Sequence, residues 1–140
     1  MLERWHAAPA SGDLPDILDE LALARKDAGG DLVVIEVISA EASLPSAEAV
    51  RDAMRCVRRL RYLRSLHLVV IEGDSVQRAL IRGVFTSLAF LVGEAEGATM
   101  CRTLDEAVAR ACEATGQDPA ALLREIGATG LLESARAVVP

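Results

Sequence analysis

Hydrophobic residues follow two different rhythms along this chain. In some stretches they recur at every third or fourth position, which is the spacing of one face of a helix. In others they form short continuous runs rich in Val, Ile and Leu, which are typical of strands covered on both faces. The clearest runs are residues 32–38 and 66–72. Because helical stretches alternate with these runs, the pattern predicts an α/β fold with a mostly parallel sheet of about four strands.

The expected elements form four strand–helix units followed by a helical tail. We expect strands at 2–8, 32–38, 66–72 and 98–102, and helices at 13–28, 46–65, 75–93 and 104–115. The helix after Thr103 begins with a capping box, because Glu106 follows that threonine at the required spacing. A short helix should start at Asp118 and a last one near Leu131. The predicted organisation is therefore one α/β domain at 1–116 with a C-terminal helical extension at 117–140.

The expected helix at 75–93 is unusual because apolar residues surround most of it. A helix of this kind is either the most buried one in its domain or the one that meets a partner. Gly83 in its middle costs about 1 kcal/mol relative to alanine. Close packing or a local break in the helix would explain that glycine.

Composition narrows the classes of protein that this chain can belong to. Of its 140 residues 51% are hydrophobic, 26% are charged and only 3% are aromatic, and the net charge is −6. An acidic chain is repelled by phosphate backbones, so we expect no nucleic-acid partner. The longest apolar run, 84–92, is about half of the ~20 residues that a membrane span needs. Three cysteines without a C-x-x-C pair suggest free thiols, so we expect a cytoplasmic location.

The charge is distributed unevenly, because one helix collects arginines. Residues 51–64 hold six arginines against the single acid Asp52. Four of them make the candidate docking face, namely Arg51, Arg55, Arg58 and Arg59. This face either pairs with local acids or docks an acidic partner, which could be another protein or a second copy of the chain.

Residues 31–112 resemble a STAS domain, the fold of bacterial anti-sigma-factor antagonists. A strand leads through a loop into a helix ending Val-Arg-Arg-Leu-Arg, and a second strand leads into Val-Gln-Arg-Ala-Leu-Ile-Arg-Gly-Val. A short strand ending at Arg102 precedes Thr-Leu-Asp-Glu-Ala-Val. The resemblance implies a non-catalytic regulatory or scaffolding role through protein contacts. We also expect no cofactor.

This sequence departs from the STAS pattern in two places. The family usually opens with two paired strands, whereas only residues 2–8 are available here. Its phosphorylated site is an Asp-Ser pair between a strand and a helix, whereas residues 39–46 contain serines but no Asp-Ser pair. Ser43 and Ser46 are the candidates for phosphorylation, because a phosphate would be favoured near a helix N-terminus. The alternative is that Ser46 is only an N-cap.

Catalytic chemistry has few candidates in this chain. It contains no G-x-G-x-x-G or Walker motif, no G-x-S-x-G elbow, and no Cys/His spacing typical of zinc. Glu36 is the oddest residue, because a carboxylate in a buried strand needs a partner. An ion pair with an arginine, or an edge position open to water, would account for it; a functional acid is the alternative. We expect His67 to be a packed or rim residue, because active sites of open α/β sheets favour the opposite ends of the strands.

Three functions are compatible with these patterns. The first is a regulatory or scaffolding module that acts through protein contacts. The second is a carrier or sensor of a small apolar ligand, suggested by the apolar helix at 75–93. The third is a small enzyme that uses Glu36 or His67. We place them in that order, because no catalytic constellation accompanies either residue in the sequence.

Overall fold

A computed structural model of the chain describes residues 1–7, 12–91 and 98–130. Within two helices only the backbone is described at residues 57, 58, 60, 61, 77, 85 and 87–91. The last predicted helix, from Leu131, lies outside the described residues.

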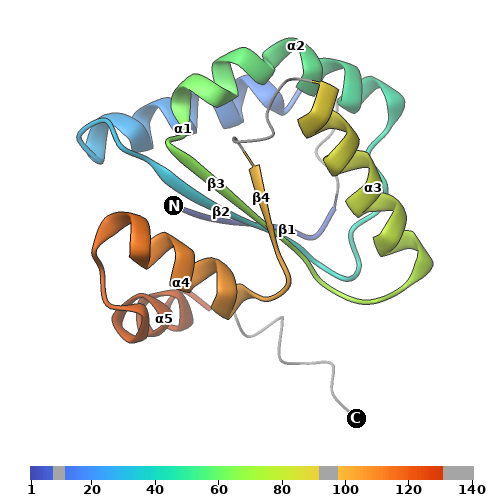
Figure 1. Cartoon of the computed structure of the whole chain (residues 1–140). Coiled ribbons are helices and arrows are strands. Elements are labelled where there is room, and N and C mark those ends of the chain that lie inside the picture. Colours follow the sequence, from blue (N-terminus) through green and yellow to red (C-terminus); the bar gives the residue numbers. More distant parts are fainter. Residues whose placement is uncertain (8–11, 92–97, 131–140) are drawn as a thin grey trace.

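A four-stranded, all-parallel sheet forms the centre of the fold (Figure 1). Its strands lie in chain order: β1 (Leu2–Trp5), β2 (Val33–Ile38), β3 (Leu66–Ile71) and β4 (Ala98–Cys101). The predicted α/β class is therefore confirmed. The first strand is shorter than the expected 2–8, and it lies at an edge of the sheet as the partner of β2.

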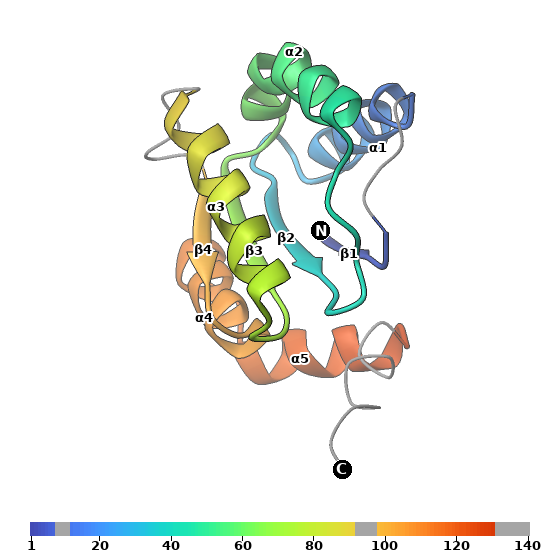
Figure 2. The same ribbon diagram turned by 90° about the vertical axis from the view of Figure 1, so that its right-hand side faces the viewer.

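Helices cover both faces of this sheet (Figures 1 and 2). Figure 1 shows α1 (Leu14–Asp27), α2 (Ala47–Leu63) and α3 (Val76–Leu91) on one face. On the opposite face lie α4 (Leu104–Thr115) and α5 (Pro119–Ala128). The first three helices connect successive parallel strands, and crossovers of one handedness carry all of them to the same side.

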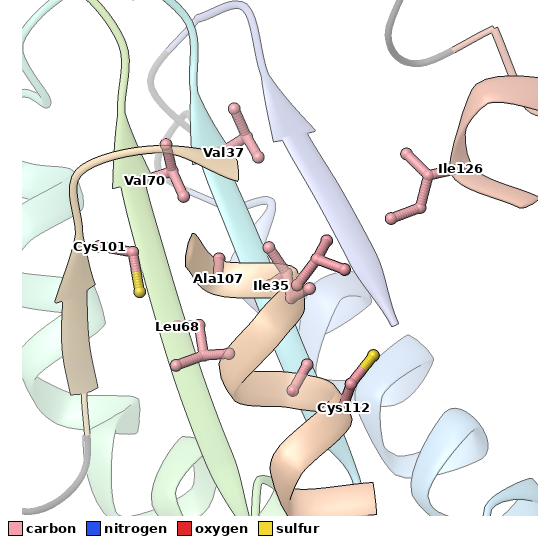
Figure 3. Close-up of a cluster of buried hydrophobic side chains, with 10 residues drawn as sticks. Ile35, Val37, Leu68, Val70, Cys101, Ala107, Cys112 and Ile126 are labelled. Carbon is pink, nitrogen blue, oxygen red and sulfur yellow. The ribbon is translucent and has the colours of Figure 1, made fainter. Parts of the chain in front are cut away.

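The largest apolar cluster lies between the sheet and α4 with α5 (Figure 3). It contains alternate residues of β2 and β3, the last residue of β4 and side chains from both helices: Ile35, Val37, Leu68, Val70, Cys101, Ala107, Val108, Ala111, Cys112 and Ile126. The other face holds two smaller clusters. One packs Val34 against α1 and α2, and the other packs Ile38 and Val69 against Ile81 of α3. Glu36 lies between Val34 and Ile38 on that face of β2, so a polar side chain separates the two clusters.

The helix ends confirm most of the predicted caps. The Ser46 hydroxyl accepts a hydrogen bond from the Ala49 backbone N–H (3.0 Å), and the Thr103 hydroxyl accepts one from the Glu106 N–H (3.2 Å). The Glu106 carboxylate accepts a hydrogen bond from the backbone N–H of Arg102 (2.8 Å) and not from that of Thr103. Asp13 occupies the N-cap position of α1, but its side chain makes no cap hydrogen bond.

Helix α3 differs from its sequence prediction at Gly83. The helix is continuous from Val76 to Leu91, so there is no break. A Cβ atom added at Gly83 would meet no atom within 4 Å, so close packing does not explain the glycine either. Nothing in the structure explains why this position is not alanine.

Candidate functional site

The arginines of α2 were the first candidate surface, and the structure places three of the four. Arg51, Arg55 and Arg59 are exposed, whereas the side chain of Arg58 lies outside the described residues. Arg55 pairs with Asp52 (3.1 Å) on the same helix. Arg59 reaches Asp19 on the neighbouring helix α1 (3.0 Å). Local acids therefore partly neutralise this face, and exposed pairs of this kind contribute little stability.

Helix α3 presents apolar side chains to solvent, so among its described side chains the expected full burial is not found. Val76 is 80% exposed and Leu80 is 55% exposed. They stand one turn apart and therefore share one side of the helix. Leu44, in the loop between β2 and α2, is 43% exposed. That loop runs beside the first turns of α3 in both views (Figures 1 and 2).

The serines of the same loop differ in their surroundings. Ser39 is buried, and its hydroxyl accepts a weak hydrogen bond from the Glu41 backbone N–H (3.4 Å). Ser46 caps α2, which is the structural role that the sequence allowed for it. Ser43 is exposed, immediately before Leu44. Of the two phosphorylation candidates, only Ser43 is exposed without also capping a helix.

Two arginines of α3 hold the carboxyl ends of β2 and β3 in place. Arg78 is only 2% exposed, and its Nη2 atom donates to the carbonyl oxygens of Ala40 and Ala42 (2.8 Å for Ala42). Arg82 donates to the carbonyl oxygens of Ile71 (3.4 Å) and Gly73 (3.2 Å). In the sequence both residues stand out only as members of the stretch that resembles a STAS domain. A basic residue in the first turn of an otherwise apolar helix was the signal that could have singled out Arg78.

Glu36 and His67 form the second polar group, and the structure brings them together. The Nε2 atom of His67 lies 2.7 Å from a carboxylate oxygen of Glu36. The Nδ1 atom of His67 lies 2.8 Å from Nη1 of Arg64, which follows α2. An arginine can only donate, so Nδ1 is the acceptor and the proton sits on Nε2, which donates to Glu36. The partner of Glu36 is thus a histidine backed by an arginine, rather than the arginine alone.

A third acid, which sequence reasoning missed, stands beside this group. Glu3 on β1 is the register partner of Glu36 on β2, so both side chains leave the same face of the sheet. Burial, together with the neighbouring charge of Glu36, raises the pKa of Glu3 to about 7, whereas Arg64 opposes the shift. Burial also disfavours ionised Glu36, but the hydrogen bond from His67 and the positive charge of Arg64 lower its pKa on balance.

This polar group lies away from the usual position of an α/β active site. His67 is the second of six residues in β3 and Glu36 the fourth of six in β2, so the group lies between the amino end and the middle of the sheet and not at its carboxyl edge. Ligands of open parallel sheets bind outside the carboxyl ends. The expectation that His67 is a packed residue agrees with its burial, at 7% exposure. In the described part of the chain, no group of three His, Cys, Asp or Glu side chains could hold a metal ion.

Comparison of the chain with known proteins found no relative. No family model matches the chain, and neither a curated protein nor a solved structure is significantly similar to it. Within the described residues no helix has both the length and the apolar character needed to cross a bilayer.

Proposed function

We propose that this chain is a non-catalytic regulatory or scaffolding module, similar to a STAS domain, that acts by binding another protein. The contact surface consists of the outer side of α3 at Val76 and Leu80 together with Leu44. The single observation that supports it most is the 80% exposure of Val76. An apolar side of a helix left in water favours association, because contact with a partner removes that surface from solvent.

Charge near this surface favours a particular kind of partner. Arg51 and Arg55 are exposed on α2, the helix that the loop holding Leu44 enters. Arginines on the helix that follows Leu44 would accelerate association with an acidic partner and help to set its orientation. Phosphorylation of Ser43 would place negative charge next to Leu44 and would weaken binding of such a partner.

A pull-down from an extract of the native host tests this proposal. The immobilised chain is compared with a variant in which Val76→Asp and Leu80→Asp are combined, and captured proteins are quantified by mass spectrometry. We expect one protein, or a second copy of the chain, to be bound about tenfold less by the variant, because a buried charge would replace an apolar contact. Repeating the capture at high salt reveals whether the arginines contribute.

A matched control comes from the opposite end of the same face of the sheet. Leu23 on α1 is 60% exposed, so Leu23→Asp makes the same chemical change outside the proposed surface. It should leave capture unchanged. The proposed surface is wrong if every captured protein binds the double variant as well as it binds the wild type, and if the wild type and the double variant have the same oligomeric state in solution.

A further inference from the structure

Four buried side-chain nitrogens in the described part of the chain have no hydrogen-bond partner. They are Nε of Arg4, Nε1 of Trp5, and Nε and Nη1 of Arg78. All four are donors, so what each lacks is an acceptor. Their residues also share a location, since β1 ends at Trp5 and the side chain of Arg78 contacts the segment that follows β2. Unsatisfied donors at the carboxyl edge of a parallel sheet indicate a position where a ligand supplies the acceptor.

Arg78 and Trp5 lie on the same face of the sheet, whereas Arg4 belongs to the other. Trp5 packs against the buried cluster that contains Ala42, and the Arg78 guanidinium donates to the Ala42 carbonyl oxygen. The Ser39 backbone N–H donates to the Trp5 carbonyl oxygen (2.9 Å), which ties the end of β1 to the start of the same loop. The side chain of Arg4 extends across the other face to Glu72 (2.8 Å), so a carboxylate already balances its charge.

The Arg78 guanidinium is the group that needs an anion most. It is 2% exposed, and its described hydrogen bonds go only to the neutral carbonyl oxygens of Ala40 and Ala42. A buried cation without a counter-charge is costly, and a hydrogen bond to an anion is about twice as strong as one to a neutral acceptor. An anion that reached this guanidinium would therefore compete well with the loop carbonyls.

Among the described residues, nearby acids do not occupy the position. Glu72 is paired with Arg4, and Glu41 and Asp74 are exposed to solvent, which screens their charge. Arg82 adds a second positive charge one turn further along α3. The first turn of α3 contains no acidic residue, so its N-terminal dipole also favours an anion.

We propose that Arg78 and Trp5, where residues 39–42 meet the first turn of α3, bind a small oxyanion, either a phosphate or a carboxylate group. Arg78 supplies the main donors and the Trp5 indole N–H supplies another. These donors are covered in the present structure, so residues 39–42 move aside as the anion enters and binds the unsatisfied Nε and Nη1 atoms of Arg78. Binding thereby couples a small ligand to the loop that holds Ser43 and Leu44. The proposal goes beyond the protein-binding role and does not depend on it.

The single tryptophan of the chain makes a direct experiment possible. Proton–nitrogen NMR spectra of the full chain are recorded while inorganic phosphate, acetate or chloride is added at constant ionic strength. We expect the Trp5 indole N–H and the Arg78 Nε–H signals to shift together and saturably with phosphate, acetate or both. The stronger of the two anions identifies the ligand class. Chloride should cause no saturable shift.

Two conservative variants separate the site from a general effect of charge. Arg78→Lys keeps the charge but removes the planar donors, and it should weaken binding at least about tenfold. Arg82→Lys makes the same change one turn away, where the guanidinium already donates to two carbonyl oxygens, and it should bind as the wild type does. A spectrum of Arg78→Lys as dispersed as the wild-type spectrum shows that the variant is folded.

Several results would overturn the proposal. In the wild type, the proposal is wrong if phosphate and acetate cause no saturable shift, or if they cause only the shift that chloride causes. It is also wrong if only one of the two signals, Trp5 indole N–H or Arg78 Nε–H, shifts. Unchanged affinity in a folded Arg78→Lys variant would overturn it as well. A contact between these two N–H groups and a trapped water, without any anion effect, would show that water alone supplies the acceptor.

Discussion

At the scale of single residues, the polar group around Glu36 on one face of the sheet contains more carboxyl groups than positive charges. Glu36, His67 and Arg64 form a chain in which a neutral imidazole links a carboxylate to a guanidinium. That chain is balanced, with one negative and one positive end. Glu3 adds a second carboxyl on the neighbouring strand, and its pKa of about 7 means that it stays protonated to a higher pH than an ordinary glutamate. The fold therefore tolerates Glu3 best in its neutral form.

This imbalance predicts a stability change in the variant Glu3→Gln that depends on pH. The folded-state pKa of Glu3 lies above its ordinary value of 4.5, so the folded chain binds the extra proton and loses stability as the pH rises from about 4.5 through 7. Glutamine is always neutral. We expect the free energy of unfolding of Glu3→Gln to be on the order of 1–3 kcal/mol higher than that of the wild type at pH 8, and similar to it at pH 5. Urea denaturation at the two pH values measures the difference.

A surface acid provides the comparison for this experiment. Glu113 on α4 is exposed, so Glu113→Gln should change stability little at either pH. A Glu3→Gln variant no more stable than the wild type at pH 8 would show that Glu3 is ionised there without cost.

At the scale of the elements, α3 has an unfavourable residue in its interior. Gly83 is exposed and has a helical backbone, and a Cβ atom there would meet nothing within 4 Å. Gly83→Ala should therefore stabilise the protein by about 0.5–1 kcal/mol, because alanine loses less backbone entropy and adds no clash. Thermal unfolding followed by circular dichroism measures this as a rise in Tm.

Gly116 is the matched control for that substitution. It ends α4 with a φ of 71°, a conformation that favours glycine, so Gly116→Ala should destabilise the chain instead. If both alanines lowered the Tm, α3 would have a close neighbour at Gly83 that the structure does not show.

At the scale of the whole molecule, the hydrophobic pattern was enough to predict the fold class but not the candidate site. Strands alternating with helices gave the parallel sheet and nearly every boundary, because both periodicities arise from local backbone geometry. The contact between Glu36 and His67 depends on the register of two strands that are apolar on both faces, and such strands have no pattern that fixes register. The exposed side of α3 was equally beyond reach, since a helix with apolar residues around most of its surface does not reveal which side faces the sheet.

The position of the proposed anion site could not be predicted from the sequence either. Arg78, Trp5 and the loop holding Ser39 come from separate parts of the chain, and only the strand order brings them to one edge of the sheet. The STAS resemblance remains a prediction, since the comparisons neither support nor contradict it. What the structure adds is a location: apolar side chains in water and unsatisfied donors both occur around the first turns of α3.

This arrangement predicts that α3 opens more easily than the rest of the fold. Among its described side chains only Arg78 and Ile81 are buried, whereas α4 buries Ala107, Val108, Ala111 and Cys112. Segments with few buried apolar contacts exchange their amide hydrogens through local opening at a low free energy. In hydrogen–deuterium exchange followed by mass spectrometry, we expect α3 to exchange at least about tenfold faster than α4 and the central strands β2 and β3, which corresponds to about 1.4 kcal/mol. Equal protection of α3 and α4 would mean that α3 is part of the most stable core, and a helix held so firmly would be a poor element for coupling a bound anion to a protein partner.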